Sequence, residues 1–352
     1  MNQFEYQITQ DGSVGLYDND AKDILHSVTG ALKESFDKFI YPTDYEDYCK
    51  KNSSVSVLDI CFGIGYNTKA AIFSAIKNNS ESKIYITALD INKSFAFLSP
   101  FIKDGLNAPE INLYLLSYFL FNFDEFASFI SEYFKSNPDI TGKFFAPEIC
   151  RVFNDFFEHG GIFTSLNEVS SFLHNIYYQN VSNSMEIAPK PFKTANIAFD
   201  IIFGDARQTL QSINHKYNFV FLDGYTPHKQ PLLWTYNFLE LIKSKMHADG
   251  ILSTYSNSTP VRKSLSELNF YIGKIILENS QFGTIAAFNK SKIKHELSVY
   301  DLGLMETKAG IPYYDNNFNL SASEILSARE ELVKESNKQS ATEYKKRYQN
   351  EI

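Results

Sequence analysis

A pattern repeated along the chain constrains the fold more than any other feature: short hydrophobic segments end in a glycine or an acidic residue. Residues 55–60, 83–89, 197–203 and 218–222 are rich in β-branched and aromatic side chains, which is typical of buried strands. Residues 67–77 lie between the first two and predict a helix from the spacing of their apolar side chains. Alternating strands and helices favour an α/β, Rossmann-like fold on a mostly parallel sheet.

The remaining segments predict how the chain is organised around this sheet. Residues 1–50 form a small N-terminal extension with short strands and a helix, and residues 51–320 form the main domain. Clustered aromatic and aliphatic residues with periodic acids, interrupted by Pro and Gly, predict a helical insertion at about 105–194. We expect a polar linker at 50–54, an exit turn at 247–250 after a helix at 232–246, an antiparallel hairpin near 271–289 and a polar helix at 321–352.

Composition excludes several classes of protein. With 44% hydrophobic and 21% charged residues among 352, the chain can bury a large core. The longest apolar run, near 111–123, is too short for a membrane span, and no signal peptide is evident. Cys49, Cys61 and Cys150 are odd in number and lack metal-ligand spacing, so we expect a reduced, cytoplasmic protein without a metal. The net charge of −8 does not itself favour nucleic-acid binding.

A glycine-containing turn follows the first predicted strand. Gly63 and Gly65 allow a ligand to approach the backbone, where the amides at the start of the next helix can meet its polar groups. A dinucleotide fingerprint would have a third glycine at the position of Thr68. Asp59 is unfavourable beside a pyrophosphate but suits the ammonium group of a methionine moiety. The turn therefore favours S-adenosylmethionine (SAM) over a dinucleotide, and an ordinary tight turn is the alternative.

Acidic residues follow three further strands. Asp90 ends the second strand, where a carboxylate can accept both ribose hydroxyls of a nucleoside. Gly204-Asp205-Ala206 ends the third, where the acid can bond an adenine amino group. Asp223 ends the fourth. Because ligands of open α/β sheets bind beyond the carboxyl ends of the strands, we expect these acids to converge. Solvated strand-end acids and common Gly-Asp turns are the alternatives.

The segment around Asp223 suggests the chemistry. Methyl transfer to an amine needs alignment, desolvation and a neutral nitrogen, and a nearby carboxylate can orient the amine and take its proton. Tyr225 can stack on a flat base and Lys229 can meet a phosphate, while Glu34 and His26 can cap the site; each is also explained as an ordinary structural or surface residue. Five cations form either a basic rim for RNA or a solvated face: Arg262, Lys263, Lys290, Lys292 and Lys294.

Residues 218–231, with Trp234-Thr235, resemble the phrase D-x-x-F-L-D-G-F-x-P-x-K-N-P-x-x-W-T. The phrase belongs to the bacterial methyltransferases that form 5-methylaminomethyl-2-thiouridine in tRNA, the MnmC methyltransferase domain. Phe203-Gly204-Asp205-Ala206 is similar to the family's F-G-D-A, and residues 62–67 resemble its F-G-T-G-L-N. Further segments resemble T-x-D-G…S-x-x-G-A-x-x-E, P-G-G-x-x-x-T-F…V-R-R-x-L and the tail of stand-alone members: 9–12 with 27–34, 248–265 and 310–315.

The resemblance implies a Rossmann-like SAM-dependent methyltransferase fold, SAM as donor, and the 5-aminomethyl group of wobble uridine 34, in the tRNA anticodon, as acceptor. It implies that Asp223 is the catalytic residue, and that a separate oxidase or other enzyme supplies the aminomethyl group. Departures are Tyr225 for Phe, Gln230 for Asn and Asp90 for the Glu of many members. The predicted cofactor site comprises Glu34, Asp59, Phe62, Gly63, Gly65, Asn67, Asp90, Gly204, Asp205 and Ala206. The predicted substrate site comprises Tyr225, Pro227 and Lys229.

Three other functions are compatible with the same sheet. The first is methylation of a different amine on a small molecule or a protein. The second is aminopropyl transfer of the spermidine-synthase type, although Tyr225-Thr226-Pro227 offers no additional carboxylate for a polyamine. The third is a non-catalytic scaffold, which the acids at four strand ends argue against.

Overall fold

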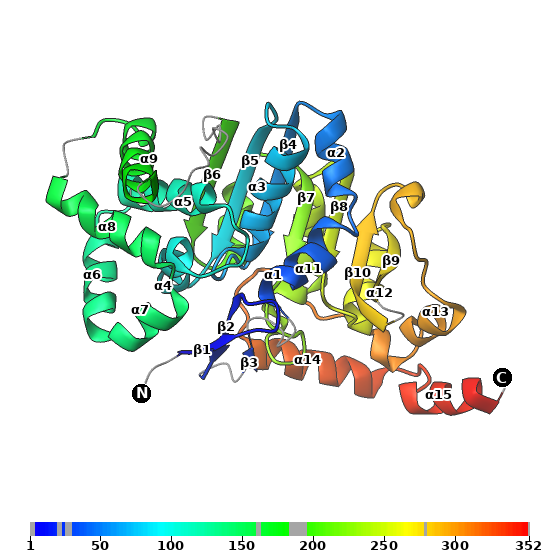
Figure 1. Cartoon of the computed structure of the whole chain (residues 1–352). Coiled ribbons are helices and arrows are strands. Elements are labelled where there is room, and N and C mark those ends of the chain that lie inside the picture. Colours follow the sequence, from blue (N-terminus) through cyan, green and yellow to red (C-terminus); the bar gives the residue numbers. More distant parts are fainter. Residues whose placement is uncertain are drawn as a thin grey trace.

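A seven-stranded sheet forms the centre of the computed structural model, which describes residues 4–19, 23–24, 30–159, 163–182, 196–277 and 280–350 (Figure 1). Its strand order is β6-β5-β4-β7-β8-β10-β9. The strands are β4 (Ser54–Ile60), β5 (Lys83–Asp90), β6 (Ile197–Phe203), β7 (Tyr217–Leu222), β8 (Met246–Thr254), β9 (Tyr271–Leu277) and β10 (Ser280–Ala287). The architecture confirms the predicted Rossmann-like α/β fold.

The pairing of the strands explains where a ligand can bind. β4 lies in the middle, parallel to β5 on one side and to β7 on the other. β6 and β8 extend the sheet in parallel, whereas β10 is antiparallel to both β8 and β9. The antiparallel pair confirms the predicted C-terminal hairpin. Since β4 to β8 are parallel, their carboxyl ends lie along one edge, and the segments that follow them meet there.

Both faces of the sheet are buried. Val57 packs in one apolar cluster with Ile86 and Phe199, while its neighbour Leu58 packs in a second cluster with Val220. Neighbouring residues on a strand point to opposite faces, so these two clusters require helices on both sides. Besides α1 of the N-terminal extension (Ala31–Ser35), the α-helices of the described residues outside the insertion are α2 (Tyr45–Lys51), α3 (Tyr66–Asn78), α10 (Ala206–Ser212), α11 (Tyr236–Ser244), α12 (Thr259–Glu267), α13 (Val299–Met305), α14 (Ala322–Glu335) and α15 (Ala341–Asn350).

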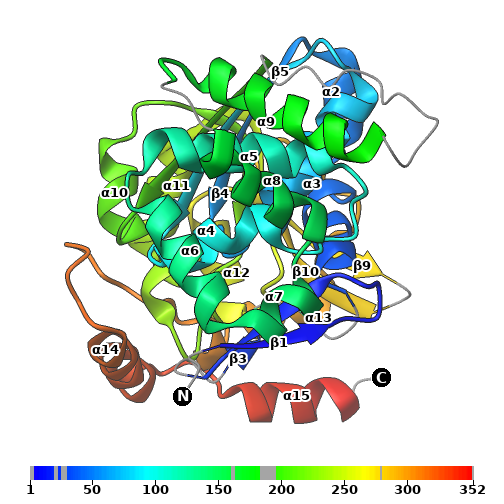
Figure 2. The ribbon, with the colours of Figure 1, turned by 60° about the vertical axis from the view of Figure 1, so that its left-hand side comes forward.

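Helices also fill the region between β5 and β6, in front of the sheet in Figure 2. They are α4 (Lys93–Leu98), α5 (Pro109–Asn122), α6 (Phe126–Ser136), α7 (Pro138–Phe144), α8 (Pro147–His159) and α9 (Leu166–Ser182). The amphipathic pattern at 119–134 is divided between α5 and α6. The break lets the rings of Phe119 and Phe126 stack with centroids 5.5 Å apart, and both rings meet Phe97 edge-on.

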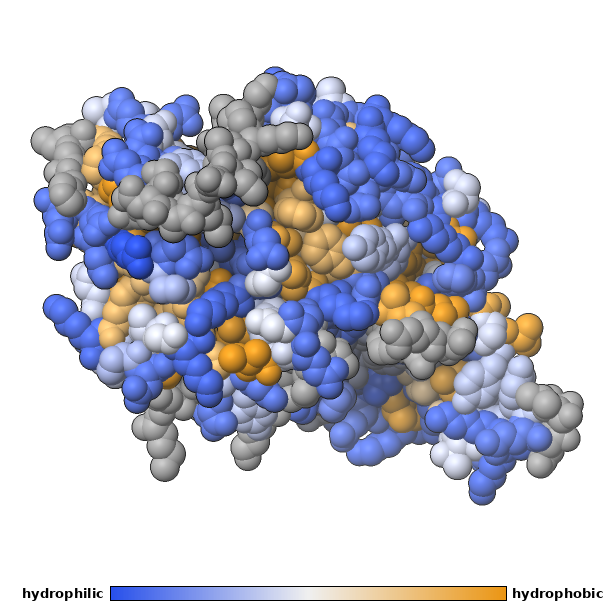
Figure 3. Space-filling view, viewed as in Figure 1, coloured by the Kyte–Doolittle hydropathy of each residue, from blue (hydrophilic) through white to orange (hydrophobic). Residues whose placement is uncertain are grey.

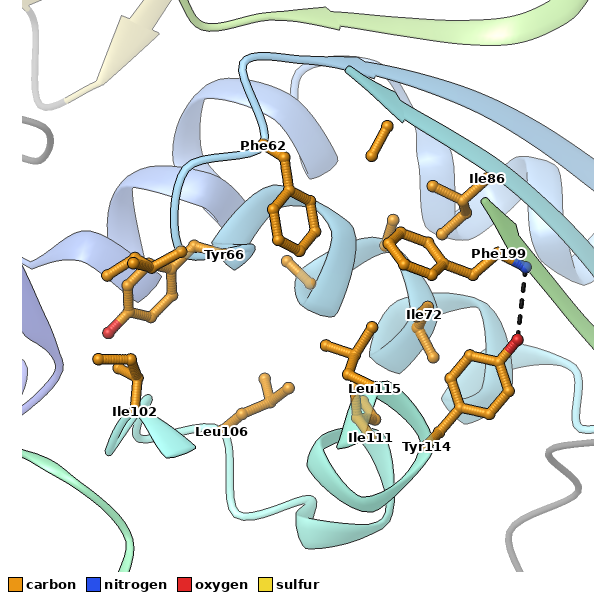
Figure 4. Close-up of a cluster of buried hydrophobic side chains, with 14 of the residues drawn as sticks. Phe62, Tyr66, Ile72, Ile86, Ile102, Leu106, Ile111, Tyr114, Leu115 and Phe199 are labelled. Carbon is orange, nitrogen blue, oxygen red and sulfur yellow. Dashed lines mark hydrogen bonds between the residues drawn. The ribbon is translucent and has the colours of Figure 1, made fainter. Parts of the chain in front are cut away.

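Two tyrosines of α5 cover the exposed edge of β6. Tyr114 Oη donates to the carbonyl of Ile197 at 3.1 Å and accepts from the amide of Phe199 at 3.4 Å, as Figure 4 shows for Phe199. Tyr118 Oη accepts from the amide of Ile201 at 3.2 Å. The hydroxyls, one helical turn apart, thus pair with backbone groups on alternate residues of β6, which pairs with β5 on one side and with no strand of the described residues on the other. The helix therefore protects this edge from pairing with another chain.

We expect Tyr114→Phe and Tyr118→Phe each to reduce the free energy of unfolding by about 1 kcal/mol, because each leaves buried backbone groups without a partner. The double variant should lose roughly twice as much, measured by urea denaturation. Tyr85→Phe is the matched control, because Tyr85 lies in the neighbouring strand with 40% of its surface exposed. A double variant as stable as this control would contradict the role of the hydroxyls.

The N-terminal extension forms a separate small sheet of β1 (Phe4–Ile8), β2 (Val14–Asp18) and β3 (Asp23–Ile24), followed by α1 (Ala31–Ser35) and the π-helical η1 (Phe36–Ile40). Short strands were expected in this extension, and its first two strands form an antiparallel pair. His26 lies outside the described residues.

Three local predictions were wrong. The linker expected at 50–54 is only residues 52–53, because Lys50 and Lys51 belong to α2 and Ser54 begins β4. The exit turn expected at 247–250 is part of β8, because these residues extend the strand through an irregular register with β7. The tail is two helices, α14 and α15, each started by a serine cap, rather than one.

Hydrophilic residues predominate on the face drawn in Figure 3, and hydrophobic residues show in separate patches among them. Among the described residues, no helix combines the length and the apolar character that crossing a membrane requires.

Candidate functional site

A cavity of about 590 Å³ lies at the carboxyl edge of the parallel strands. Residues that follow β4, β5, β6, β7 and β8 contribute to its wall, as does α1 of the N-terminal extension. Most of the predicted site residues line it: Glu34, Phe62, Gly63, Asn67, Asp90, Gly204, Asp205, Ala206, Asp223 and Tyr225. Four predicted residues do not: Asp59, Gly65, Pro227 and Lys229.

The two glycines of the first turn have different roles. Gly63 has φ +57° and would place a Cβ with no atom within 4 Å, so its backbone faces open space. Gly65 has φ +84°, and a Cβ there would lie 2.5 Å from Ser99 Oγ and 2.6 Å from Phe62 Cζ. Gly65 is therefore required for packing, whereas Gly63 leaves its backbone accessible to a ligand.

Asp90 is fixed at the end of β5 by backbone amides. Gly63 donates to one carboxylate oxygen and Asn92 to the other, both at 2.7 Å. Burial raises the pKa of Asp90 to about 6, even though these two bonds favour the ionised form. Each oxygen retains a further lone pair, so the carboxylate can also accept hydrogen bonds from the hydroxyl groups of a ligand in the cavity.

Asp205 lies at the N-terminus of α10 and is held by an arginine. Its carboxylate accepts from the amide of Arg207 at 2.9 Å, from Nε at 3.1 Å and from Nη2 at 2.7 Å. Arg207 also donates to Asp315 at 2.6 Å, and Asp315 is 1% exposed. Asp205 thus connects the cavity wall to the segment before α14.

Asp59 lies behind the cavity wall rather than on it. Its side chain is fully buried and accepts from Thr68 Oγ1 at 2.6 Å, which joins β4 to α3. Burial raises the pKa of Asp59 to about 7. Oδ2 of the carboxyl group therefore supports the glycine turn, while its buried Oδ1 has no hydrogen-bond partner among the described residues.

Asp223 lies where the cavity meets the N-terminal extension. Its Oδ2 accepts from Asn67 Nδ2 at 2.9 Å. Burial, and next the negative charge of Glu34, raise the pKa of Asp223 to about 7. Lys38 opposes that effect and is itself ion-paired with Glu34. The carboxyl group therefore titrates near neutral pH, which suits a group that takes up and releases a proton.

The loop after β7 is held from two sides. Trp234, the only tryptophan of the chain, donates from Nε1 to the carbonyl of Tyr225 at 2.7 Å. Tyr255 donates from its hydroxyl to the carbonyl of Gly224, also at 2.7 Å. These bonds leave the Tyr225 side chain on the cavity wall, while Pro227 is buried and Lys229 is exposed outside it.

Sequence reasoning did not assign several residues that line the cavity. Tyr255 follows β8, so the rule that ligands bind beyond the strand ends predicts it once β8 is placed beside β7. The apolar contributors have no such signal because nothing in their local sequence differs from core residues. The unassigned residues are Cys61, Tyr66, Leu89, Ile91, Asn92, Phe95, Gly224, Thr226, Gln230, Leu232, Leu233, Trp234 and Tyr255.

The proposed basic rim is mostly neutralised by carboxylates. Lys290 pairs with Glu296 at 2.9 Å, and Lys294 pairs with Asp44 at 2.5 Å. Lys263 pairs with Glu306, and Arg262 is buried. In the part of the chain that the structure describes, no group of His, Cys, Asp or Glu is arranged to hold a metal ion.

Comparisons with known proteins relate the chain to SAM-dependent methyltransferases. A family described as S-adenosyl-L-methionine-dependent methyltransferase matches residues 166–284. An uncharacterized protein of Methanocaldococcus jannaschii is 26% identical over 92% of this chain and 70% of its own length. The bifunctional tRNA 5-methylaminomethyl-2-thiouridine biosynthesis protein MnmC of Leptospira interrogans is 33% identical over 32% of this chain. That alignment spans 17% of the MnmC protein, so most of the bifunctional relative has no counterpart in the match.

A solved structure with a similar fold is MnmC2 from Aquifex aeolicus. It superposes with a TM-score of 0.63 over 95% of this chain and 86% of its own, at 22% identity. At this identity the likeness describes the fold.

Proposed function

We infer that this chain, a SAM-dependent methyltransferase related to the MnmC proteins, methylates an amine, and we propose that the amine is the 5-aminomethyl group of wobble uridine in tRNA. One observation carries the proposal: Asp90 and Asp223, from the ends of two strands, line the same cavity. In this proposal, Asp90 binds the nucleoside of SAM and Asp223 accepts a proton from the acceptor amine.

The cavity fits SAM. Gly63 leaves backbone open to a ligand, and Asp90 presents a carboxylate beside it for the ribose hydroxyls. Phe62, Gly204 and Ala206 form adjacent wall for the adenosyl group. When bound, SAM supplies an electrophilic methyl group on a positively charged sulfur.

Asp223 is the residue we assign to the acceptor amine. The amine must be uncharged to react, and the methylated product carries an additional proton. Asp223 can hold the amine through one hydrogen bond and accept that proton when the product forms. Leu232, Leu233 and Trp234 surround this end of the cavity with apolar surface, which excludes water from the amine.

The choice of tRNA rests on the MnmC relatives and on the shape of the acceptor end. Tyr225 lies on the cavity wall with its backbone carbonyl fixed by Trp234, so its ring can stack on a base that is turned out of an RNA loop. The amine would then lie next to Asp223. Another enzyme must supply the aminomethyl group.

The test is incubation with methyl-labelled SAM and tRNA that lacks only the terminal methyl group. We expect label on the wobble uridine, identified by nucleoside mass spectrometry. Transfer to another amine, but not to this tRNA, would reject the tRNA proposal. Transfer of an aminopropyl group from decarboxylated SAM would replace methyl transfer itself.

SAM binding should depend on pH through Asp90. The ionised carboxylate accepts hydrogen bonds from the ribose hydroxyls, so protonation below the raised pKa of about 6 weakens SAM binding. The dissociation constant should then rise with decreasing pH, approaching tenfold per pH unit. Calorimetry between pH 5 and 8 measures this. Asp90→Asn should bind weakly with little pH dependence in that range. The same pH dependence in Asp90→Asn would assign it to another group.

Cations of α15 are the candidates for contact with the RNA backbone. Lys345 and Lys346 are exposed, and neither forms a salt bridge with a carboxylate of the described residues, although the charge of Lys346 contributes to lowering the pKa of Glu343. In Figures 1 and 2, α14 and α15 run along the same side of the molecule as the N-terminal hairpin. The slope of the logarithm of the tRNA-binding constant against the logarithm of the salt concentration should fall in magnitude by about 1 to 2 when both lysines are replaced by Gln. Lys290→Gln with Lys294→Gln, two paired lysines, is the matched control and should change it little.

A further inference from the structure

A line of hydrogen bonds connects the N-terminal extension to Asp223. Ser35 Oγ donates to Asn67 Oδ1 at 2.7 Å, and Asn67 Nδ2 donates to Asp223 Oδ2 at 2.9 Å. Ser35 is 1% exposed and Asn67 is 4% exposed, so water does not compete for these bonds. Three elements contribute one residue each: α1, the start of α3, and the loop after β7.

The chemistry of the Asn67 amide determines which of its atoms faces Ser35 and which faces Asp223. The oxygen of an asparagine side chain only accepts, and its NH₂ group only donates. A hydroxyl donor at the oxygen therefore holds the NH₂ group toward the carboxylate. Asp223 Oδ1 has no hydrogen-bond partner among the described residues, although Asp223 lines the cavity. We propose that Ser35 is a positioning residue: it fixes the Asn67 amide, which holds Asp223 Oδ2 and leaves Oδ1 for the acceptor amine.

The position of Ser35 is itself determined by the β1–β2 turn. Ser13 Oγ accepts from the amide of Ala31 at 2.9 Å, and Asp11 Oδ2 accepts from the amide of Lys33 at 2.8 Å. These bonds cap the start of α1, where Gly30 has φ +150° and a Cβ would lie 2.2 Å from Asp11 Oδ2. The small hairpin, separate from the main sheet, thereby orients a residue that acts on Asp223.

The charges around Asp223 show why the amide matters. Glu34 and Lys38 face it from α1 and η1, and Asp59 and Cys61 lie on the side of β4. Glu34 raises the pKa of Asp223, whereas Asn67 and Lys38 lower it. Asn67 is the group that donates directly to the carboxylate. If its amide can rotate, its oxygen can accept from protonated Asp223, so the neutral form gains stability and the pKa rises.

This inference rests on the proposed function for the catalytic role of Asp223, but its main test does not require the acceptor. The variant is Ser35→Ala, and the probe is the infrared carboxyl band of Asp223, identified by subtracting the spectrum of Asp223→Asn. We expect the titration midpoint to rise by about 0.5 to 1 pH unit. Ser35→Thr, which keeps the hydroxyl, should restore it, and Ser35→Cys, a weaker donor, should be intermediate.

Ser74→Ala is the matched control. Ser74 is a fully buried serine on α3, and its hydroxyl has no hydrogen-bond partner within the described residues. The Ser74→Ala substitution removes the same atom without changing the hydrogen bonds between Ser35, Asn67 and Asp223, so the titration of Asp223 should not change. Single-turnover methyl transfer to aminomethyl-tRNA gives the second measurement. We expect about a tenfold loss at pH 7 in Ser35→Ala, a smaller loss at pH 9, and a SAM affinity within twofold.

The outcomes separate the two ideas. A Ser35→Ala midpoint equal to that of Ser74→Ala overturns the positioning role, whatever the acceptor is. If Ser35→Ala does not fold, an unshifted midpoint in Ser35→Cys has the same meaning. A shifted midpoint with no transfer to this tRNA by any variant, wild type included, would keep the positioning role and reject the proposed substrate.

Discussion

Asp223→Asn is expected to reduce the rate of methyl transfer by about 10²- to 10⁴-fold while leaving SAM affinity within a few-fold. The amide has nearly the same shape but cannot accept the proton of the product ammonium. In the wild type, the Asp223 carboxylate lies on the cavity wall, accepts a hydrogen bond from Asn67 and is close to Glu34. Single-turnover assays measure the rate, and calorimetry measures SAM binding.

The pH profile gives this prediction a second signature. Because burial raises the pKa of Asp223 to about 7, the rate in the wild type should fall as pH decreases through that value, where the carboxylate becomes protonated. Asp223→Asn should lose this acidic limb along with most of the rate. Asp139→Asn, an exposed acid on α7, is the control and should behave like the wild type. A rate within threefold of the wild type in Asp223→Asn would remove Asp223 from the mechanism.

Lys69→Ala is expected to cause the largest loss of stability, about 3 to 5 kcal/mol. Lys69 is 1% exposed, and its Nζ donates to the carbonyl of Ser99 at 2.7 Å and to Asp104 Oδ2 at 3.0 Å. Removing the lysine leaves a buried carboxylate without its countercharge. The pair joins α3 to the segment before α5, so the loss should destabilise the helical region as well as the site.

Urea denaturation measures the change in the free energy of unfolding. Lys77→Ala is the matched control, because Lys77 lies on the same helix but is exposed. Combining Lys69→Met with Asp104→Asn should recover part of the stability, since the buried charge is then removed together with its partner. A single Lys69→Ala variant no less stable than Lys77→Ala would show that the buried pair contributes nothing net.

The predicted fold followed from local signals that are strong in this chain. Short runs rich in β-branched and aromatic residues identified β4, β5, β6 and β7, and the glycines at 63 and 65 marked the turn into α3. The segments that failed are those where tertiary packing overrides local pattern. The residues expected to form an exit turn at 247–250 instead belong to β8, which pairs with β7.

By itself, the sequence determined that Asp90, Asp205 and Asp223 end parallel strands and so meet at one edge, because strand direction and side-chain period are local properties. The tertiary structure alone decided what each acid contacts there. Asp59 is buried outside the cavity lining and accepts a hydrogen bond from Thr68, and Asp205 accepts hydrogen bonds from Arg207. These outcomes depend on residues far apart in the sequence that burial and hydrogen bonding bring together, and no local pattern encodes such pairings.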